Sequence, residues 1–218
     1  MTLATKKLTF AEYLKYDDGT DNIYELVDGE LVAMLGTGKH GAVTEYLNDK
    51  FKDEAKRKGH PWTSKDMRSG IRSPRGGRWD TSRIPDTTVL TIEQWKSLAN
   101  REAVIEWGEA PPILVVEVVS ESTKNTDYRS KRSEYAVLDI SEYWIVDPLS
   151  DLITVCTLTE GFYDAVEFRG NERIVGATFP ELELTVAQIL EVGDWGIRGF
   201  FTTVSFLSCI LCIIFTLK

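Results

Sequence analysis

The chain has 218 residues, a formal net charge of −9 and 43% hydrophobic residues. This length and apolar content predict a globular protein with one substantial core. The overall acidity argues against indiscriminate binding of polyanions, although a local cluster of Lys and Arg can still bind phosphate. The N-terminus lacks the apolar stretch of a signal peptide, and the three cysteines are an odd count, which together predict a reduced, cytoplasmic protein.

Local signals define the first predicted elements of the chain. Residues 9–12 have the pattern of a capping box and predict a short helix. Asp28-Gly29 separates two short apolar runs and predicts a β-hairpin over residues 23–34. Apolar side chains then recur every four residues until a glycine follows, so an amphipathic helix is expected over residues 40–58.

The rest of the sequence predicts strands in alternation with helices. Strands are expected at 62–73, 86–91, 113–120 and 142–146, with two or three more in 151–175, and helices at 92–98, 125–138 and 185–192. Alternating elements without an internal repeat predict one α/β domain, residues 1–197, with a central mixed β-sheet flanked by helices.

The C-terminal segment, residues 198–218, differs in composition from the domain before it. Residues 199–217 form an apolar run of 19 residues without charge, flanked by basic residues. A helix of this length would span about 28 Å, close to the thickness of the hydrocarbon core of a bilayer. Two interpretations stay open: a membrane anchor, which would attach the protein to a membrane, and an extension unrelated to the domain.

Two carboxylates are distinguished by the residues around them. Asp86 follows a proline at the start of one apolar run, and Glu117 lies inside a second run, residues 113–119. An unpaired charge in an apolar core costs several kcal/mol or stays protonated, so Glu117 needs a partner. A hard divalent cation, Mg²⁺ or Mn²⁺, takes oxygen ligands and often only one or two protein carboxylates. We therefore expect a metal site formed by Asp86, Glu117 and the backbone carbonyl of Val118.

A metal ion of this kind polarises a phosphoryl oxygen and lowers the pKa of an attacking water. A cluster of basic residues precedes Asp86, with six Lys and Arg within 19 positions: Lys65, Arg68, Arg72, Arg75, Arg78 and Arg83. We expect four of them to contact the phosphates of DNA beside the metal, namely Arg72, Arg75, Arg78 and Arg83. The alternative interpretation is a charged surface loop without a partner.

Four segments of the chain carry a family resemblance. They are Pro85-Asp86, the run 112–120, the set Asp127, Lys131 and Tyr135, and residues 142–148, with the sequence Glu-Tyr-Trp-Ile-Val-Asp-Pro. Together they resemble the Uma2 family, a group of endonucleases abundant in cyanobacteria and formerly a domain of unknown function. The resemblance extends from the helix at residue 9, through residues 24–29 and His40, to Val186. It implies a restriction-endonuclease-like PD-(D/E)xK fold.

The resemblance also implies roles for individual residues. Asp86 and Glu117 match the two metal-binding acids, and Glu25 matches a position near the same site, where it would orient water or a second metal. The generic nuclease motif has a lysine two positions after the second acid, but this residue is Val119 here. In the Uma2 pattern a lysine on the following helix matches Lys131, whose flexible side chain would reach back to assist the attacking water or the transition state.

The implied function is a Mg²⁺-dependent endonuclease that hydrolyses phosphodiester bonds in DNA, and nucleases of this fold often act as homodimers. Three alternatives stay open. Glu117 would form a structural ion pair with Lys131 or Arg132 in a catalytically inactive nuclease fold that binds DNA or protein. The apolar tail would be the functional part of a membrane-tethered interaction protein. A glycosidase also uses two carboxylates, although nothing in the sequence marks a sugar cleft.

Overall fold

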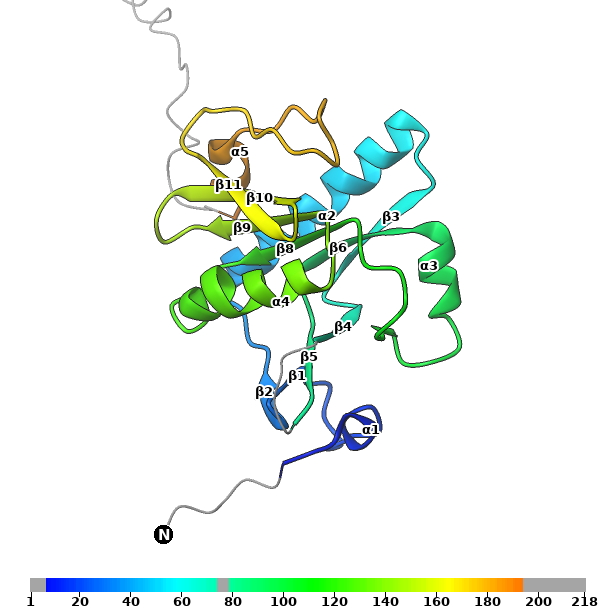
Figure 1. The fold of residues 1–218 in the computed structure, drawn as a ribbon. Helices are drawn as coiled ribbons and strands as arrows, with labels where there is room; N and C mark the ends of the chain where they lie inside the picture. Colours follow the sequence, from blue (N-terminus) through cyan, green and yellow to red (C-terminus); the bar gives the residue numbers. More distant parts are fainter. Residues whose placement is uncertain (1–6, 74–78, 194–218) are drawn as a thin grey trace, which may run out of the picture.

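The computed structural model describes residues 7–73 and 79–193, which fold around two β-sheets (Figure 1). Two of the predicted DNA-binding residues, Arg75 and Arg78, lie outside the described residues. The apolar run 199–217 and the predicted domain boundary after residue 197 also lie outside them. Among the described helices, none is both long and apolar enough to cross a bilayer. The membrane anchor therefore stays a prediction.

The larger sheet is mixed, as the sequence predicts. Its six strands follow the order β11-β10-β9-β8-β6-β3. β8 and β9 pair in parallel, and the other neighbours pair antiparallel. The strands are β3 (Trp62–Asp66), β6 (Thr87–Thr91), β8 (Leu114–Val118), β9 (Glu142–Asp147), β10 (Leu152–Thr159) and β11 (Phe162–Phe168).

Helices cover both faces of this sheet (Figure 1). On one face, α2 (Gly38–Lys58) packs its apolar stripe against the sheet, with Phe51 edge-on to Trp144. α5 (Val186–Leu190) belongs to the same core. On the opposite face, α4 (Arg132–Val137) packs Tyr135 into a second core. Burial on both faces explains why the central strand β8 is almost continuously apolar.

Side chains along β8 alternate between the two faces of the larger sheet, and this alternation determines the face on which Glu117 lies. Val116 and Val118 belong to the core under α2, whereas Val115 and Val119 belong to the core under α4. Because successive side chains of a strand point to opposite faces, Glu117 points to the α4 side. The helix predicted over 125–138 lies on that side.

That helix differs from the prediction in its geometry. The structure has a π-helix, η1 (Thr126–Lys131), that continues into α4. A π-helix has i→i+5 hydrogen bonds and a wider turn than an α-helix, and it occurs often at functional sites. Asp127 and Lys131 are both buried, with 1% and 4% of their surface exposed. The wider turn therefore accompanies two charged side chains that face the sheet.

The smaller sheet was not predicted as a separate unit. Its order is β2-β1-β5-β4-β7, and α1 (Phe10–Tyr13) packs on it through Phe10. The predicted hairpin is confirmed as its first two strands. The strands are β1 (Tyr24–Val27), β2 (Glu30–Ala33), β4 (Gly70–Ser73), β5 (Thr81–Arg83) and β7 (Val104–Ile105).

The chain crosses between the two sheets at two points where the regular strand conformation ends. Met67, between β3 and β4, has a φ of 47°, and Pro85, between β5 and β6, has no N–H to donate. The Met67 N–H donates to the Asp86 carbonyl at 3.1 Å, so the two crossings lie side by side. Asp86 therefore lies where the two sheets meet.

The other predicted elements are confirmed with small shifts at their ends. The helices at 92–98 and 185–192 are α3 (Ile92–Ser97) and α5, and both begin with capping boxes. The capping box at residues 9–12 is present as well. The region 151–175 holds two strands, β10 and β11.

Candidate active site

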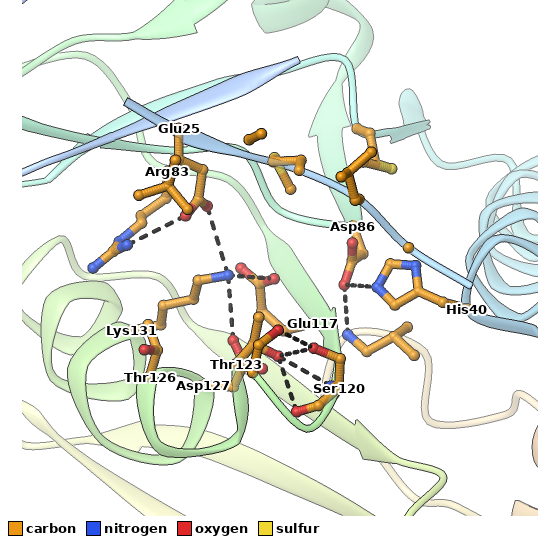
Figure 2. A pocket seen from close by; sticks show the side chains of 18 of the residues that line it. Glu25, His40, Arg83, Asp86, Glu117, Ser120, Thr123, Thr126, Asp127 and Lys131 are labelled. Atoms are coloured by element: carbon orange, nitrogen blue, oxygen red, sulfur yellow. Dashed lines mark hydrogen bonds and ion pairs between the residues drawn. The ribbon is translucent and has the colours of Figure 1, made fainter. Parts of the chain in front are cut away.

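Glu117 is the buried centre of the site, with 2% of its surface exposed. One carboxylate oxygen, Oε1, accepts a hydrogen bond of 2.6 Å from the Tyr135 hydroxyl. The other, Oε2, lies 2.8 Å from Lys131 Nζ. These two contacts from η1 and α4 fix the orientation of the carboxylate above the sheet, and Figure 2 shows the one from Lys131.

Lys131 reaches into the same pocket from η1. Its Nζ also contacts Asp127 Oδ1 at 3.3 Å and Glu25 Oε1 at 3.6 Å. Val119, at the position of the generic lysine, is buried in the apolar core under α4. The ammonium therefore reaches Glu117 from the helix instead of from the strand.

Asp86 is held on the other side of the same pocket. Its Oδ2 accepts a hydrogen bond of 2.6 Å from the Val118 N–H and lies 3.2 Å from His40 Nε2. The amide of Val118 thus links Asp86 to the strand that carries Glu117. His40 stands in the first turn of α2, so both sheets and α2 contribute to the pocket (Figure 2).

Glu25 is held by a buried arginine. The Arg83 guanidinium contacts Glu25 Oε2 at 3.2 Å and Glu134 through two hydrogen bonds of 2.8 and 2.9 Å. The Ile84 N–H donates to Glu25 Oε1 at 3.0 Å. With these contacts the smaller sheet presents Glu25 to Lys131.

The DNA-binding prediction is corrected for Arg83 and Arg72. Arg83 is 1% exposed and fully engaged by carboxylates, so no phosphate can reach it. Arg72 pairs with Asp80 at 2.9 Å and lies between the rings of Phe10 and Trp107, 4.1 and 3.9 Å from their centroids. A guanidinium held between two rings and a carboxylate stabilises the smaller sheet.

Acidic groups outnumber basic ones in this pocket. Its cavity of about 270 Å³ is lined by four carboxylates, those of Glu25, Asp86, Glu117 and Asp127. The basic groups that line it are Lys131, Arg83 and His40, and Arg83 is shared with a further carboxylate outside the lining. Within the described lining, the balance of charge favours an additional cation.

The pKa shifts follow from this crowding. Burial raises the pKa of Glu117 well above its ordinary value, and the neighbouring acids add to the effect while Lys131 opposes it. Burial likewise raises the pKa of Asp127. Burial would lower the pKa of Lys131, but Glu117, Glu25 and Asp127 outweigh it, so this pKa is raised and the ammonium stays charged. The pKa of His40 is also raised, because Asp86 outweighs the effect of burial.

The donor set fits a small, hard cation with few protein ligands. In the described part of the chain, no group of three or more His, Cys, Asp or Glu side chains is arranged to hold a metal ion. Asp86 and Glu117 nevertheless line one pocket, and Mg²⁺ often needs only one or two carboxylates because water and substrate phosphate complete its shell. The raised pKa of Glu117 is the second observation in favour, since a nearby divalent charge would relieve it.

Comparison with known proteins gives the family. A family model, Uma2, described as "Putative restriction endonuclease", matches residues 10–187. The chain belongs to the Uma2 family. Among solved structures, this Uma2 chain is similar to a protein from Anabaena variabilis ATCC 29413, described as a putative nuclease belonging to DUF820. The two share 17% identity with a TM-score of 0.66, over 84% of this chain and 98% of the other. None of the curated proteins compared with the chain matches it.

These matches confirm the predicted family and nuclease-like fold, while the roles of the site residues stay predictions. The predicted site omitted three residues that the structure brings together, Asp127, Tyr135 and His40. Two signals were available for Asp127 and Tyr135: both belong to the residues that carry the family resemblance, and with Lys131 they recur every four residues, which marks one face of a helix. The contact between His40 and Asp86 joins distant segments, so no local signal predicts it.

Proposed function

We propose that this Uma2 protein is an endodeoxyribonuclease that depends on a divalent metal ion and hydrolyses phosphodiester bonds in DNA. In this proposal Asp86 and Glu117 hold Mg²⁺ or Mn²⁺, with the Val118 carbonyl as a further ligand. Lys131 assists the attacking water or the transition state. One observation carries the proposal: Lys131 Nζ lies 2.8 Å from Glu117 in the pocket that Asp86 also lines.

The bound cation would polarise a phosphoryl oxygen and lower the pKa of the attacking water. The protein's own groups supply orientation and charge. Tyr135 and the Val118 N–H fix one oxygen each of Glu117 and Asp86, so the two ligands are set before the metal arrives. Preset ligands reduce the reorganisation that the reaction requires.

Lys131 supplies a permanent positive charge. Its raised pKa keeps the ammonium protonated, which suits stabilisation of negative charge on the phosphate better than removal of a proton from water. Asp127 and Glu25 lie 3.3 and 3.6 Å from Nζ, so the ammonium keeps acidic partners when a metal ion engages Glu117. Glu25 would also orient water on this side of the pocket.

The experiment compares single substitutions in the pocket with a matched control outside it. Asp86→Asn, Glu117→Gln and Lys131→Met are each expected to reduce cleavage of DNA in Mg²⁺ or Mn²⁺ by about 10²-fold or more. Glu54→Gln removes another buried acid, which pairs with Arg57 on α2, and should leave cleavage unchanged. Retained cleavage in all three pocket variants would contradict the proposal.

The contacts of Glu117 also favour a second function, that of an inactive nuclease fold. Both of its oxygens are occupied, one by Tyr135 and one by Lys131, as expected for a structural ion pair in an inactive fold that binds DNA or protein. Calorimetry with Mn²⁺ separates the two functions. Binding that Glu117→Gln abolishes supports the nuclease, whereas DNA binding without metal binding or cleavage supports the inactive fold. Whichever of the two functions holds, the homodimer and the contact of the tail with a membrane stay predictions.

A further inference from the structure

The pocket that holds Glu117 has an apolar rim on one side. β2 and the loop after it contribute Val32, Ala33, Met34, Leu35 and Gly36 to the lining. Leu35 is 86% exposed and Val32 is 46% exposed, although both line a pocket that also holds four carboxylates. Exposed apolar side chains gathered at one place mark a contact surface, whereas scattered ones do not. We call Val32 and Leu35 the apolar rim.

The apolar rim is fixed beside the carboxylates. Val32 pairs with Glu25 across the hairpin, so their side chains lie on the same face of the smaller sheet. A Cβ atom at Gly36 would lie 2.7 Å from His40 Nδ1, so the loop after β2 packs directly against the imidazole. The apolar rim therefore lines the same pocket as Asp86 and Glu117.

The cations of the same pocket are buried and already paired. The side chains of Lys131 and Arg83 are 5% and 2% exposed, and each contacts at least two carboxylates. His40 lies against Asp86. Among the described residues that line the pocket, no Lys or Arg is exposed. Lys and Arg neutralise the phosphates of duplex and single-stranded DNA alike, and the described walls of this pocket do not expose them. Contact with the apolar rim must then supply part of the affinity, and only a single strand offers it unpaired bases.

We propose that the site acts on unpaired DNA, and that a base next to the scissile phosphate packs against Leu35 and Val32. This inference rests on the proposed nuclease function. The faces of stacked bases are covered in a duplex, whereas an unpaired base exposes a flat face that contacts apolar side chains. A cavity of about 270 Å³ suits one phosphodiester group and its sugar, since it is small among ligand cavities of about 300–1,000 Å³.

The test measures binding separately from cleavage. Fluorescence anisotropy gives the affinity of the full chain for one labelled oligonucleotide, as a single strand and as a duplex, in Ca²⁺, which takes the same oxygen ligands as Mg²⁺. The single strand is expected to bind about tenfold more tightly than the duplex, and Leu35→Ser should weaken single-strand binding by about fivefold or more. Leu149→Ser is the matched control, because Leu149 is 47% exposed and does not line the pocket.

Equal affinity for the two forms, or equal binding by Leu35→Ser and Leu149→Ser, would overturn the inference. Cleavage of both forms is measured in parallel in Mg²⁺. Equal cleavage of duplex and single strand would contradict the inference that unpaired DNA is the substrate, but it would still support the nuclease proposal. Single-strand binding that depends on Leu35, without cleavage of any DNA, overturns the nuclease proposal but supports the apolar rim as a surface for unpaired bases.

Discussion

Glu117 and Asp147 are buried carboxylates on adjacent parallel strands, β8 and β9, and their surroundings differ in the donors that they offer. Asp147 accepts hydrogen bonds from the N–H groups of Leu149 and Ser150 at 2.9 and 3.1 Å and from the Tyr128 hydroxyl at 3.1 Å. Lys124 Nζ lies 3.2 Å away. Burial alone would raise the pKa of Asp147, but these donors outweigh it, and the pKa is lowered.

Glu117 has one hydroxyl donor and one ammonium, and other acids surround it. Its pKa is raised, because burial and the charges of Asp86, Asp127 and Glu25 together exceed the effect of Lys131. Backbone amides fix Asp147 as the anchor of a turn, whereas Glu117 is left with its charge incompletely balanced. The supply of donors, more than burial itself, therefore distinguishes a structural acid from an acid that suits a cation.

Removal of the lysine beside each acid should give the largest difference in stability between the Glu117 site and the Asp147 site. Lys131→Met leaves buried carboxylates without their cation and should lower the free energy of unfolding by about 3–5 kcal/mol at neutral pH without metal. Lys124→Met removes a side chain that is 45% exposed and should cost about 1 kcal/mol or less. Urea denaturation of both variants measures this, and equal losses would break the comparison.

A divalent cation should stabilise one site and not the other. At about 100 times its dissociation constant, Mg²⁺ or Mn²⁺ is expected to add about 2.7 kcal/mol to the free energy of unfolding. Differential scanning calorimetry should show this gain in the unmodified chain and in Asp147→Asn, and its loss in Glu117→Gln. A gain that survives in Glu117→Gln would place the cation elsewhere.

The two acids should respond to pH with opposite signs. The lowered pKa of Asp147 contributes stability above its unfolded pKa of about 3.9, and this stability is lost as pH falls through the folded pKa. Asp147→Asn should therefore cost about 1.5–3 kcal/mol at neutral pH and progressively less in acid. The raised pKa of Glu117 means that metal-free stability falls as pH rises above about 4.3, and Glu117→Gln should remove that fall. Denaturation across this pH range tests both signs.

The smallest effect should come from single hydroxyl groups. Tyr135→Phe removes the 2.6 Å bond to Glu117, and Tyr128→Phe removes the 3.1 Å bond to Asp147. Each should cost about 0.5–1.5 kcal/mol of stability. Cleavage should fall in Tyr135→Phe alone, because only that hydroxyl orients a proposed metal ligand. Equal cleavage by the two variants would show that Tyr135 has a structural role.

The sequence predicted those parts of the molecule that depend on local signals. The capping box at residues 9–12, the hairpin at Asp28-Gly29 and the helix that ends at Gly59 follow from residues within a few positions of each other. Glu117 could be predicted to need a partner because its neighbours in the strand are apolar. Lys131 was found through the family pattern, and its 2.8 Å contact agrees with that expectation.

The remainder depends on contacts between distant segments. Arg83 was predicted to bind DNA because it belongs to a basic run, but the acids that bury it, Glu25 and Glu134, lie 58 and 51 residues away. The separate smaller sheet was missed because Met67 gives no sign in the sequence that it adopts a positive φ. Charge density along a chain predicts exposure poorly where the fold supplies opposite charges.

The π-helix η1 has a consequence for how this family can change in length. Asp127 and Lys131 both line the pocket from η1, which holds more residues per turn than the helix that follows it. Deletion of one residue between them would let the segment close as an ordinary α-helical turn with the flanking turns still in phase. The same deletion would remove the four-residue spacing at which the two side chains meet in the pocket. The length of η1, as well as the identity of its residues, therefore sets the geometry of the site.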